Sequence, residues 1–399
     1  MDALTTPSNW QRVRLGDIGK PCMCKRVMKH QTTRYGEIPF YKIGTFGNTA
    51  DAFISKKLFL EYKTKYSFPK KGDILISASG TIGRAVIYDG KPAYFQDSNI
   101  VWIDNDETLV KNDFLFYVYS NVKWNTEHTT ILRLYNDNFR NTLIPLPPLH
   151  EQIAIANILS DVDRYLYSLD ALILKKESVK KALRIKMLNQ ILASNGVEFR
   201  ELGDIILSLK TGLNPRSFFK LNTPNANNYY VTIRELEDYT IKFTHQTDRI
   251  DDNALSLCLK RSNLEKDDIL FSGTGTIGKV SIIEKNPNNW AIKEGIYSIK
   301  PNKKIVFPRF LMFCLESSNI QNDIKNKSFG GIVKSIPMND LQQIQIPLPP
   351  LNEQIAIANI LSALDNEITS LKNKKRQFEN IKKALNHDLM SAKIRVLKK

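Results

Sequence analysis

The chain contains two copies of one sequence pattern, and this duplication limits the folds that it can adopt. The longest repeated block, residues 145–163, returns at 347–365 with only three of its nineteen positions changed. Two shorter blocks, 15–18 and 72–84, return in the same order at 202–205 and 267–279. Solenoids and propellers have much shorter repeats and are therefore excluded. The sequence predicts two large modules built on one frame.

Between the repeated blocks the two copies scarcely resemble each other. Residues 23–35 share almost nothing with 211–223, and residues 130–138 share almost nothing with 332–340. The offset between copies also grows along the chain, which indicates insertions in the second copy. A common frame with divergent intervening segments predicts one fold that carries two different binding faces.

Each copy is expected to begin with a strand-rich part and to end in a long helix. Runs of β-branched and aromatic residues predict strands at 38–43, 73–77, 85–88, 229–233 and 268–272. Short helices are expected at 112–120 and 308–317. The proline-rich segments that follow are expected to end regular structure, because proline lacks an amide donor and fixes φ. A helical pattern of roughly 45 residues then begins in each copy.

The two long helices carry apolar residues at heptad spacing. An apolar seam of this length is incompatible with water unless it is covered, so the helices are predicted to pair with each other as a coiled coil. Lys176 and Lys375 interrupt the seam, and their stems are expected to extend along apolar neighbours. A role in fixing register or in binding a partner is the alternative. The expected pairing residues are Leu159, Val162, Leu166, Leu169, Ile173, Leu361, Leu364, Ile368, Leu371 and Phe378.

Composition favours a polyanionic partner and argues against a membrane or secreted protein. The net charge is +16, and basic side chains bind nucleic acid by releasing counterions from phosphates. No apolar run is long enough for a membrane span, and the first ten residues lack the apolar core of a secretory signal. Four cysteines are too few for a disulfide framework and lack zinc-site spacing. We expect a cytoplasmic protein with reduced thiols and no bound metal ion.

The segment 273–280 resembles three phosphate-binding patterns, namely the dinucleotide fingerprint, the kinase glycine-rich loop and most of a P-loop. Such loops must open a helix whose N-terminus holds phosphate. Residues 280–283 instead predict a strand, and Val280 replaces the hydroxyl that would hold magnesium. A structural hairpin is therefore favoured over nucleotide binding by Gly273–Gly278. The five histidines are scattered, and no catalytic motif is present. The sequence thus indicates a binding protein and not an enzyme.

Two strand-rich modules, each closed by Pro-Leu-Pro-Pro-Leu-x-Glu-Gln-Ile-Ala-Ile and a long helix, resemble the specificity subunit of type I restriction–modification systems. The resemblance is strongest at 144–163 and 346–365. It implies an α+β fold with two target recognition domains separated by two long helices. These helices would pair as an antiparallel coiled coil with internal pseudo-two-fold symmetry. The implied parts are 1–148 and 195–350 for the recognition domains, 149–194 for the central helix and 351–399 for the C-terminal helix.

The resemblance also implies how the chain would act. Each recognition domain would read one half of a split site in double-stranded DNA, and the helices would set the unread spacer. Two modification subunits, which bind S-adenosylmethionine and methylate adenine, would dock on the helices, and a motor-nuclease subunit would join for cleavage. The chain itself would bind no cofactor and catalyse nothing, in a bacterial or archaeal cytoplasm. A related system with a fused nuclease–methylase partner, an enzyme that uses the glycine loop on nucleotides and a coiled-coil scaffold without DNA contact are the alternatives.

Candidate DNA contacts lie mostly where the copies diverge. Outside the long helices the chain holds 40 basic and 31 acidic residues, a modest surplus that suggests focused basic patches. Glu151, Gln152, Glu353 and Gln354 at the helix starts are attributed to capping and packing instead. The candidates in the first domain are Lys25, Arg26, Arg34, Lys42, Arg84 and Arg133, and those in the second are Lys210, Arg216, Lys220, Arg234, Lys279 and Lys334.

Overall fold

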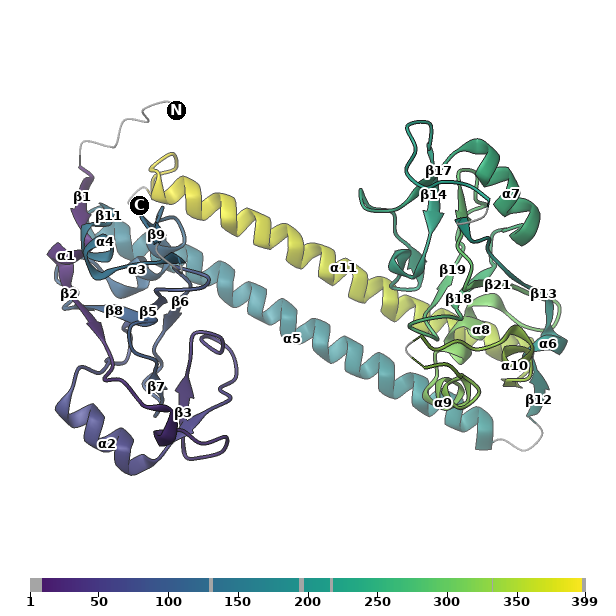
Figure 1. Cartoon of the computed structure of the whole chain (residues 1–399), viewed down its shortest axis with the longest axis horizontal. Coiled ribbons are helices and arrows are strands. Elements are labelled where there is room, and N and C mark those ends of the chain that lie inside the picture. The colour runs from purple at the N-terminus through teal and green to yellow at the C-terminus, as the bar shows by residue number, and fades with distance from the viewer. Residues whose placement is uncertain (1–8, 129–131, 194–196, 216–217, 332, 397–399) are drawn as a thin grey trace. The chain divides into compact units, whose positions relative to one another are not determined.

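The computed structural model describes residues 9–128, 132–193, 197–215, 218–331 and 333–396 (Figure 1). The chain divides into two compact units. The first comprises Met1–Ala171 with Lys372–Lys399, and the second comprises Leu172–Leu371. Each unit therefore combines one strand-rich part with segments of both long helices.

The first unit is built on a four-stranded antiparallel sheet of order β2-β8-β5-β6 and a three-stranded sheet of order β4-β3-β7. Strand β8 is apolar on both faces because the larger sheet is covered on both sides. Ile100 and Trp102 face an aromatic core with Phe40 and Tyr94, whereas Val101 faces a second core. The strands are β2 (Gly19–Met23), β3 (Ile38–Tyr41), β4 (Phe53–Ile54), β5 (Ile74–Ser77), β6 (Ala85–Ile87), β7 (Tyr94–Phe95) and β8 (Ile100–Asn105).

The second core of this unit joins the sheet to the helices. Phe114 of α3 packs there with Leu159 of the long helix α5 (Leu149–Ala193) and Leu389 of the long helix α11 (Leu351–Met390). The end of the C-terminal helix therefore belongs to the core of the first unit. Helix α2 instead contributes Phe59 to the aromatic core. The remaining elements are β1 (Gln11–Arg14), α1 (Leu15–Ile18), α2 (Lys56–Lys65), α3 (Asn112–Tyr119), β9 (Glu127–His128), β10 (Leu132–Arg133), α4 (Asn136–Asn141) and β11 (Leu143–Leu146), with a 3-10 turn at Lys29–Gln31.

The second unit repeats this frame in the same order. Its sheets are β13-β21-β18-β19 and β17-β14-β20, and Leu361 and Ile191 of the long helices join its main core. Helix α9 (Ser318–Asn326) and the hairpin formed by β15 (Leu236–Glu237) and β16 (Thr240–Ile241) are additions. The shared elements are β12 (Glu198–Glu201), α6 (Leu202–Ile205), β13 (Ile206–Thr211), β14 (Asn228–Val231), β17 (Arg249–Ile250), α7 (Asp252–Ser262), β18 (Ile269–Ser272), β19 (Val280–Ile282), β20 (Trp290–Ile292), β21 (Ile296–Pro301), α8 (Pro308–Leu315), α10 (Met338–Gln342) and β22 (Gln345–Leu348).

The proline-rich segments differ from expectation. Pro145 lies within β11, which pairs with β1, and Pro347 lies within β22, which pairs with β12. The prediction that these prolines end regular structure was therefore wrong at the first proline of each segment. Each strand has only one partner, so the missing amide donor can face away from the ladder. The helices α5 (Leu149–Ala193) and α11 (Leu351–Met390) begin directly after the last proline, as predicted.

The two long helices pair antiparallel in both units. In the first unit Asp163 bonds to Lys382 at 2.5 Å, and in the second unit Lys180 bonds to Asp365 at 2.5 Å. Because the two aspartates are 202 residues apart, as are the two lysines, these are the same pair repeated. The antiparallel pairing and the internal pseudo-two-fold repeat agree with the fold implied by the resemblance.

The predicted pairing residues are all buried or half-buried. Leu159, Leu169, Ile173, Leu361 and Ile368 are buried, and Val162, Leu166, Leu364, Leu371 and Phe378 are half-buried. The lysines in the seam do more than extend along apolar neighbours. Lys375 bonds to Asp170 at 2.7 Å, and Lys176 bonds to Glu367 at 2.9 Å. Charge pairing across the helices, and not only stem packing, therefore accommodates them.

The described ranges lack two features that would indicate other classes of function, a membrane-spanning helix and a cluster of metal ligands. None of the helices in these ranges combines the length and apolar character needed to cross a membrane. The same ranges hold no group of three histidine, cysteine or acidic side chains placed to bind a metal ion.

Candidate nucleic-acid interface

Loops of the first unit converge at the end of the larger sheet where β2 and β5 finish and β8 begins. The side chain of Asn99 accepts hydrogen bonds from Ser79 Oγ at 2.8 Å and from Arg133 Nη2 at 2.9 Å. Arg133 also donates to the carbonyl of Ser98 at 3.1 Å, and Arg26 bonds to Asp97 at 2.9 Å. The fold thus brings two predicted contacts, Arg26 and Arg133, onto one short loop.

This loop is held in an unusual backbone conformation. Ser98 adopts φ +60°, a left-handed conformation that non-glycine residues adopt only at a cost. The neighbouring side chain of Gln96 accepts from the amide of Ile43 at 2.9 Å, which ties the loop to the exit of β3. Strain of this kind persists where surrounding contacts fix it, and it is concentrated at binding sites. The observation marks the segment 96–99 as a candidate contact surface.

The other predicted cations of the first unit lie on adjoining loops. Lys42 bonds to Asp51 at 2.8 Å, and Arg84 donates to the carbonyl of Gly47 at 3.4 Å. Lys25 lies 5.0 Å from the ring centre of Tyr66. Arg34 is exposed and forms no ion pair within the described ranges, so its guanidinium is available to a phosphate.

The same end of the sheet is built again in the second unit. The amide of Gly273 donates to the carbonyl of Gly295 at 2.8 Å, and the amide of Gly295 donates to Thr211 Oγ1 at 3.2 Å. The amide of Gly275 donates to the carbonyl of Lys334 at 2.8 Å, which leaves the exposed Lys334 side chain free to point outward. The loops that follow β13 and β18 therefore meet the loop that precedes β21, as the equivalent loops do in the first unit.

The predicted cations of the second unit divide into three groups. Lys210, Lys220 and Lys334 are exposed. Arg234 bonds to Asp248 at 2.6 Å, and Lys279 donates to the carbonyl of Leu236 at 3.2 Å, so these two have protein partners. Arg216 lies outside the described residues.

The glycine loop forms the hairpin that its sequence predicted. It joins the antiparallel strands β18 and β19 and does not open a helix. Its three glycine amides already have partners, since Gly273 donates to the carbonyl of Gly295, Gly275 to that of Lys334 and Gly278 to that of Ser272. The side chain of Ser272 also accepts from the amide of Lys279 at 2.8 Å. A loop whose glycine amides are bonded to protein carbonyls does not offer the amide cradle that a nucleotide phosphate needs. The alternative of nucleotide binding at Gly273–Gly278 therefore loses its basis.

Sequence reasoning missed several exposed residues in the two units. Lys293 is exposed directly before the loop that leads into β21. Arg249 lies 4.6 Å from the ring centre of Tyr229. Tyr35 has 86% of its side chain exposed beside Arg34, and its position next to an arginine in a divergent segment was the available signal. Aromatic rings beside free cations are suited to stacking on bases as well as to binding phosphates.

Repeated glutamines fix each long helix to its strand-rich part. Gln152 Oε1 accepts from the amide of Lys111 at 2.9 Å, and its Nε2 donates to the carbonyls of Leu109 and Pro147. Gln354 forms the same three bonds with Phe307, Ile305 and Pro349. Both side chains are fully or almost fully buried. Packing, as predicted, explains why these glutamines are repeated.

The preceding glutamates behave differently in the two copies. Glu151 is buried and accepts from Trp10 Nε1 at 3.0 Å, from Asn9 Nδ2 at 2.9 Å and from Arg395 at 3.2 Å. Burial alone would raise the pKa of Glu151, but these hydrogen bonds outweigh it and hold the pKa below its ordinary value. Glu353 is exposed. Only the first glutamate therefore acts as a structural anion.

Several repeated residues at the helix starts are apolar and exposed. Leu149, Ile153 and Ile158 are exposed on α5, and the identical residues Leu351, Ile355 and Ile360 are exposed on α11. The core does not require these side chains, so their identity in both copies has no explanation in packing. Exposed apolar residues that recur in this way indicate a binding surface present twice.

Comparison with known proteins identifies the family. Residues 7–176 and 194–380 match the model of the type I restriction modification DNA specificity domain. A Haemophilus influenzae protein named "Putative type I restriction enzyme specificity subunit" is 64% identical over 148 residues, which span 37% of this chain and 38% of that protein. The type I restriction enzyme MjaVIII specificity subunit of Methanocaldococcus jannaschii is 27% identical over 99% of this chain and 95% of that protein.

A solved structure has the same fold. The S subunit of the type I restriction–modification system from M. genitalium aligns with a TM-score of 0.60 at 18% identity, over 98% of both chains. The family model covers most of the chain in two stretches, which correspond to the two copies of the repeat. The chain therefore belongs to the type I restriction–modification DNA specificity family.

Proposed function

We propose that this chain is the DNA-recognition subunit of a type I restriction–modification complex. Residues 1–148 and 195–350 each read one half of a bipartite site in double-stranded DNA. One observation carries the proposal: the converging loops occupy the same place in both units but present different basic side chains. A common frame with different contact residues is what reading two unrelated half-sites requires, because phosphate contacts position a domain and base contacts specify the sequence.

The paired helices, residues 149–194 and 351–399, set the spacer between the half-sites and dock the modification subunits. The repeated exposed residues Leu149, Ile153, Leu351 and Ile355 support two equivalent docking surfaces and hence two copies of one partner. Catalysis and S-adenosylmethionine binding belong to those partners, and a motor-nuclease subunit supplies cleavage. The fused nuclease–methylase partner remains the second candidate arrangement, which sequencing of the neighbouring genes distinguishes.

The first test maps methylated adenines in the host genome with and without this gene. The expected result is a pair of adenines at a fixed separation that loses methylation when the gene is deleted. Methylation that persists in the deletion strain would refute the proposal. A nucleotide-dependent enzyme would instead show a rise in melting temperature with ATP, and no such rise is expected.

The second test assigns each half-site to a domain. Arg34→Ala and Lys334→Ala are measured in the complex with the modification subunit, by binding to duplexes altered in one half-site at a time. A lost base contact should weaken binding by about 1–3 kcal/mol and relax preference in one half-site only. A lost phosphate contact should weaken binding to all sequences and reduce the slope of affinity against salt by about one. Arg12→Ala, an exposed residue of β1, is the control.

The docking surfaces are tested by charge. Ile153→Arg and Ile355→Arg place cations on the two exposed apolar surfaces without altering the cores. Each variant should bind one modification subunit instead of two, as measured by light scattering after size exclusion, and the double variant should bind none. Full assembly of the double variant would contradict the placement of the docking surfaces.

A further inference from the structure

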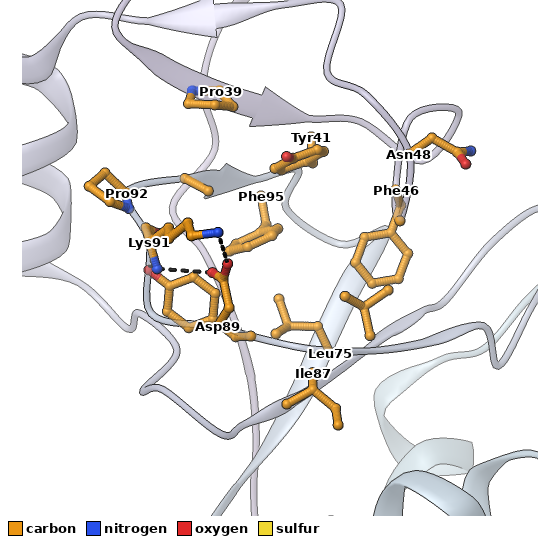
Figure 2. A pocket seen from close by; sticks show the side chains of 14 residues that line it. Pro39, Tyr41, Phe46, Asn48, Leu75, Ile87, Asp89, Lys91, Pro92 and Phe95 are labelled. Atoms are coloured by element: carbon orange, nitrogen blue, oxygen red, sulfur yellow. Dashed lines mark hydrogen bonds and ion pairs between the residues drawn. The ribbon is translucent and has the colours of Figure 1, made fainter. Parts of the chain in front are cut away.

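The first unit holds an open apolar pocket beside its larger sheet (Figure 2). The pocket has a volume of about 410 Å³. Tyr41 and Phe95 stack at 5.8 Å on one side, Phe46 closes another, and Leu75 and Ile87 form the floor in this view. The charges at the rim, Asp89 and Lys91, neutralise each other at 3.2 Å. The pocket is therefore apolar inside and carries no net charge at this rim.

An unpaired strand edge borders this pocket. Strand β6 is the last strand of the sheet β2-β8-β5-β6, and among the described residues it pairs only with β5. The bonds of Ser77 to Arg84 and of Asp73 to Tyr88 show that alternate residues of β6 face β5. The backbone groups of Ala85 and Ile87 consequently point away from the sheet. Ile87 has 42% of its side chain exposed, so an additional strand could pair here without displacing any part of the sheet.

The second unit shows how the equivalent place is filled. The strands that border the pocket, β3, β5, β6 and β7, correspond to β14, β18, β19 and β20. There the β15–β16 hairpin covers the free edge of β19, and the amide of Ile282 donates to the carbonyl of Tyr239 at 2.9 Å. Leu236 of the hairpin is only 2% exposed, and it packs in one cluster with Val231, Trp290 and the partly buried Ile241.

A substitution between the copies contributes, with the missing hairpin, to the opening of the first pocket. The amides of Gln96 and Lys293 donate to the carbonyls of Tyr41 and Val231, respectively, which fixes the alignment of the two small sheets. By that alignment Ala93 of the first unit corresponds to Trp290 of the second. Ala93 lines the pocket, whereas the indole of Trp290 fills the same position. The first unit therefore lacks both the indole and the hairpin that close this place in the second.

We propose that the pocket and the β6 edge of the first unit bind an extended polypeptide segment of a partner protein. The segment adds a strand to β6 and places one bulky aliphatic or aromatic side chain in the pocket, beside Tyr41, Ala93 and Ile87. In this mode of binding, main-chain hydrogen bonds give affinity and the side-chain pocket gives specificity. The proposal assigns the first recognition domain a protein-binding site in addition to DNA reading.

The chemistry of the site favours a polypeptide over DNA. A base would have to leave the helix stack to enter the pocket, which is costly. The rim charges Asp89 and Lys91 pair with each other. Arg84, a predicted DNA contact, bonds to the lining residues Gly47 and Asn48 but does not itself line the pocket. A polypeptide satisfies both the apolar pocket and the free backbone groups of the edge. The second unit already joins these two features with its own hairpin. Its residues 236–241 therefore define the kind of segment that fits.

The test uses that hairpin as the probe. A fluorescein-labelled cyclic peptide carrying residues 234–243 is titrated with the full-length chain, and anisotropy is recorded. We expect saturable binding to the wild-type chain and at least tenfold weaker binding to Ala93→Trp, which reproduces the filled pocket. Ile87→Lys is the second variant, because a lysine at an exposed edge position leaves the fold intact and opposes strand addition. A control peptide replaces Leu236 and Ile241 by serine and should not bind.

Each remaining outcome overturns the proposal. No saturable binding by the wild-type chain would show that the site does not accept a strand. Equal binding by wild type, Ala93→Trp and Ile87→Lys would place the peptide elsewhere. Ala93→Trp and Ile87→Lys should leave the DNA affinity of the complex unchanged. If these variants lose DNA binding and the wild-type chain does not bind the peptide, the pocket belongs to the DNA contact surface. These outcomes are independent of the half-site assignments made with Arg34→Ala and Lys334→Ala.

Discussion

Gln152 and Gln354 offer a direct test of how each long helix is fixed to its recognition domain. Replacement by methionine keeps the length and approximate volume of the side chain but removes the amide. In each copy this leaves one buried amide and two carbonyls without the partner that the glutamine supplied. The two sites are equivalent in sequence, geometry and burial.

The size of the effect follows from the three lost bonds. A buried polar group left without a partner costs about 1–3 kcal/mol. Three such groups are exposed to this cost at each site. Even if water or local relaxation satisfies them in part, the unfolding free energy should fall by about 3 kcal/mol at each site. Replacement by glutamate should lower the unfolding free energy more than replacement by methionine. Glutamate still accepts from the amide of Lys111 or Phe307, but it buries a charge and cannot donate the other two hydrogen bonds.

The assay is denaturant unfolding of the full-length chain, combined with hydrogen exchange of the two units. Gln152→Met should destabilise the first unit and Gln354→Met the second, by amounts that agree within about 1 kcal/mol. Exchange should accelerate at Lys111 in the first variant and at Phe307 in the second. A loss below about 0.5 kcal/mol in either variant, the range of ordinary surface substitutions, would refute the reasoning.

Three further predictions rest on charged side chains of the long helices that are buried or largely buried. The depressed pKa of Glu151 stabilises the fold above the ordinary carboxyl value of 4.5, and this stability is lost as the pH falls through the lower folded-state pKa. Glu151→Gln should therefore flatten the acid limb of a stability–pH curve, and an acid limb identical to that of the wild type would contradict this. Lys180→Met should lower the unfolding free energy by about 3–5 kcal/mol, because Asp365 would keep a largely buried charge without its partner. Asp365→Asn in the same background removes that charge and should recover part of the loss. Tyr239→Phe removes the hydroxyl that accepts a hydrogen bond from Lys180 at 2.9 Å. A double-mutant cycle of unfolding free energies with Lys180→Met should therefore show a coupling of at least about 0.5 kcal/mol. If the two losses simply add, the two side chains do not share a network.

Much of the fold could be predicted because its signals are local. The apolar run that became Ile74–Ser77 had to be a buried strand, and the helix start after Pro148 follows from proline chemistry. The glycine hairpin was also predictable, since a strand and not a helix follows it. The repeat strengthened each prediction, because the same element could be predicted separately from the two copies of a block.

Pairings between distant residues could not be predicted in the same way. The heptad pattern shows that Lys176 and Lys375 face the seam, but the partner acids depend on the antiparallel register, which no single helix encodes. Similarly, the convergence of Arg26 and Arg133 on the loop at 97–99 depends on the order of strands in the sheet. The β15–β16 hairpin has a two-residue turn in which Asp238 and Tyr239 both have positive φ, and neither is glycine. The usual sequence signal for that turn is therefore missing.

The cluster around Glu151 explains an asymmetry in the repeat. In the second unit the backbone itself leads from the end of α5 to β12, at Ala193 and Glu198. The equivalent junction of the first unit joins residues from distant parts of the sequence, because Arg395 donates to the side chain of Asn9 at 3.0 Å and to Glu151 at 3.2 Å. Noncovalent contacts thus hold the end of α11 next to the start of the first unit, whereas the backbone itself connects the end of α5 to the start of the second. This is why Glu151 is buried and its repeated counterpart is exposed.

A circular permutant makes this comparison measurable. Residues 399 and 1 are joined by a flexible linker, and the chain is opened between Ala193 and Val197. The first unit then gains a covalent connection. The second loses one, and in the described part of the chain Glu353 is exposed and has no such cluster around it. Closing or opening a loop of this kind changes unfolding free energy by about 2–4 kcal/mol. Hydrogen exchange should therefore slow in the first unit and accelerate in the second. Glu151→Gln should cost less in the permutant than in the original chain, since the linker now holds the junction. An equal cost in both backgrounds would show that the cluster does not act as the junction.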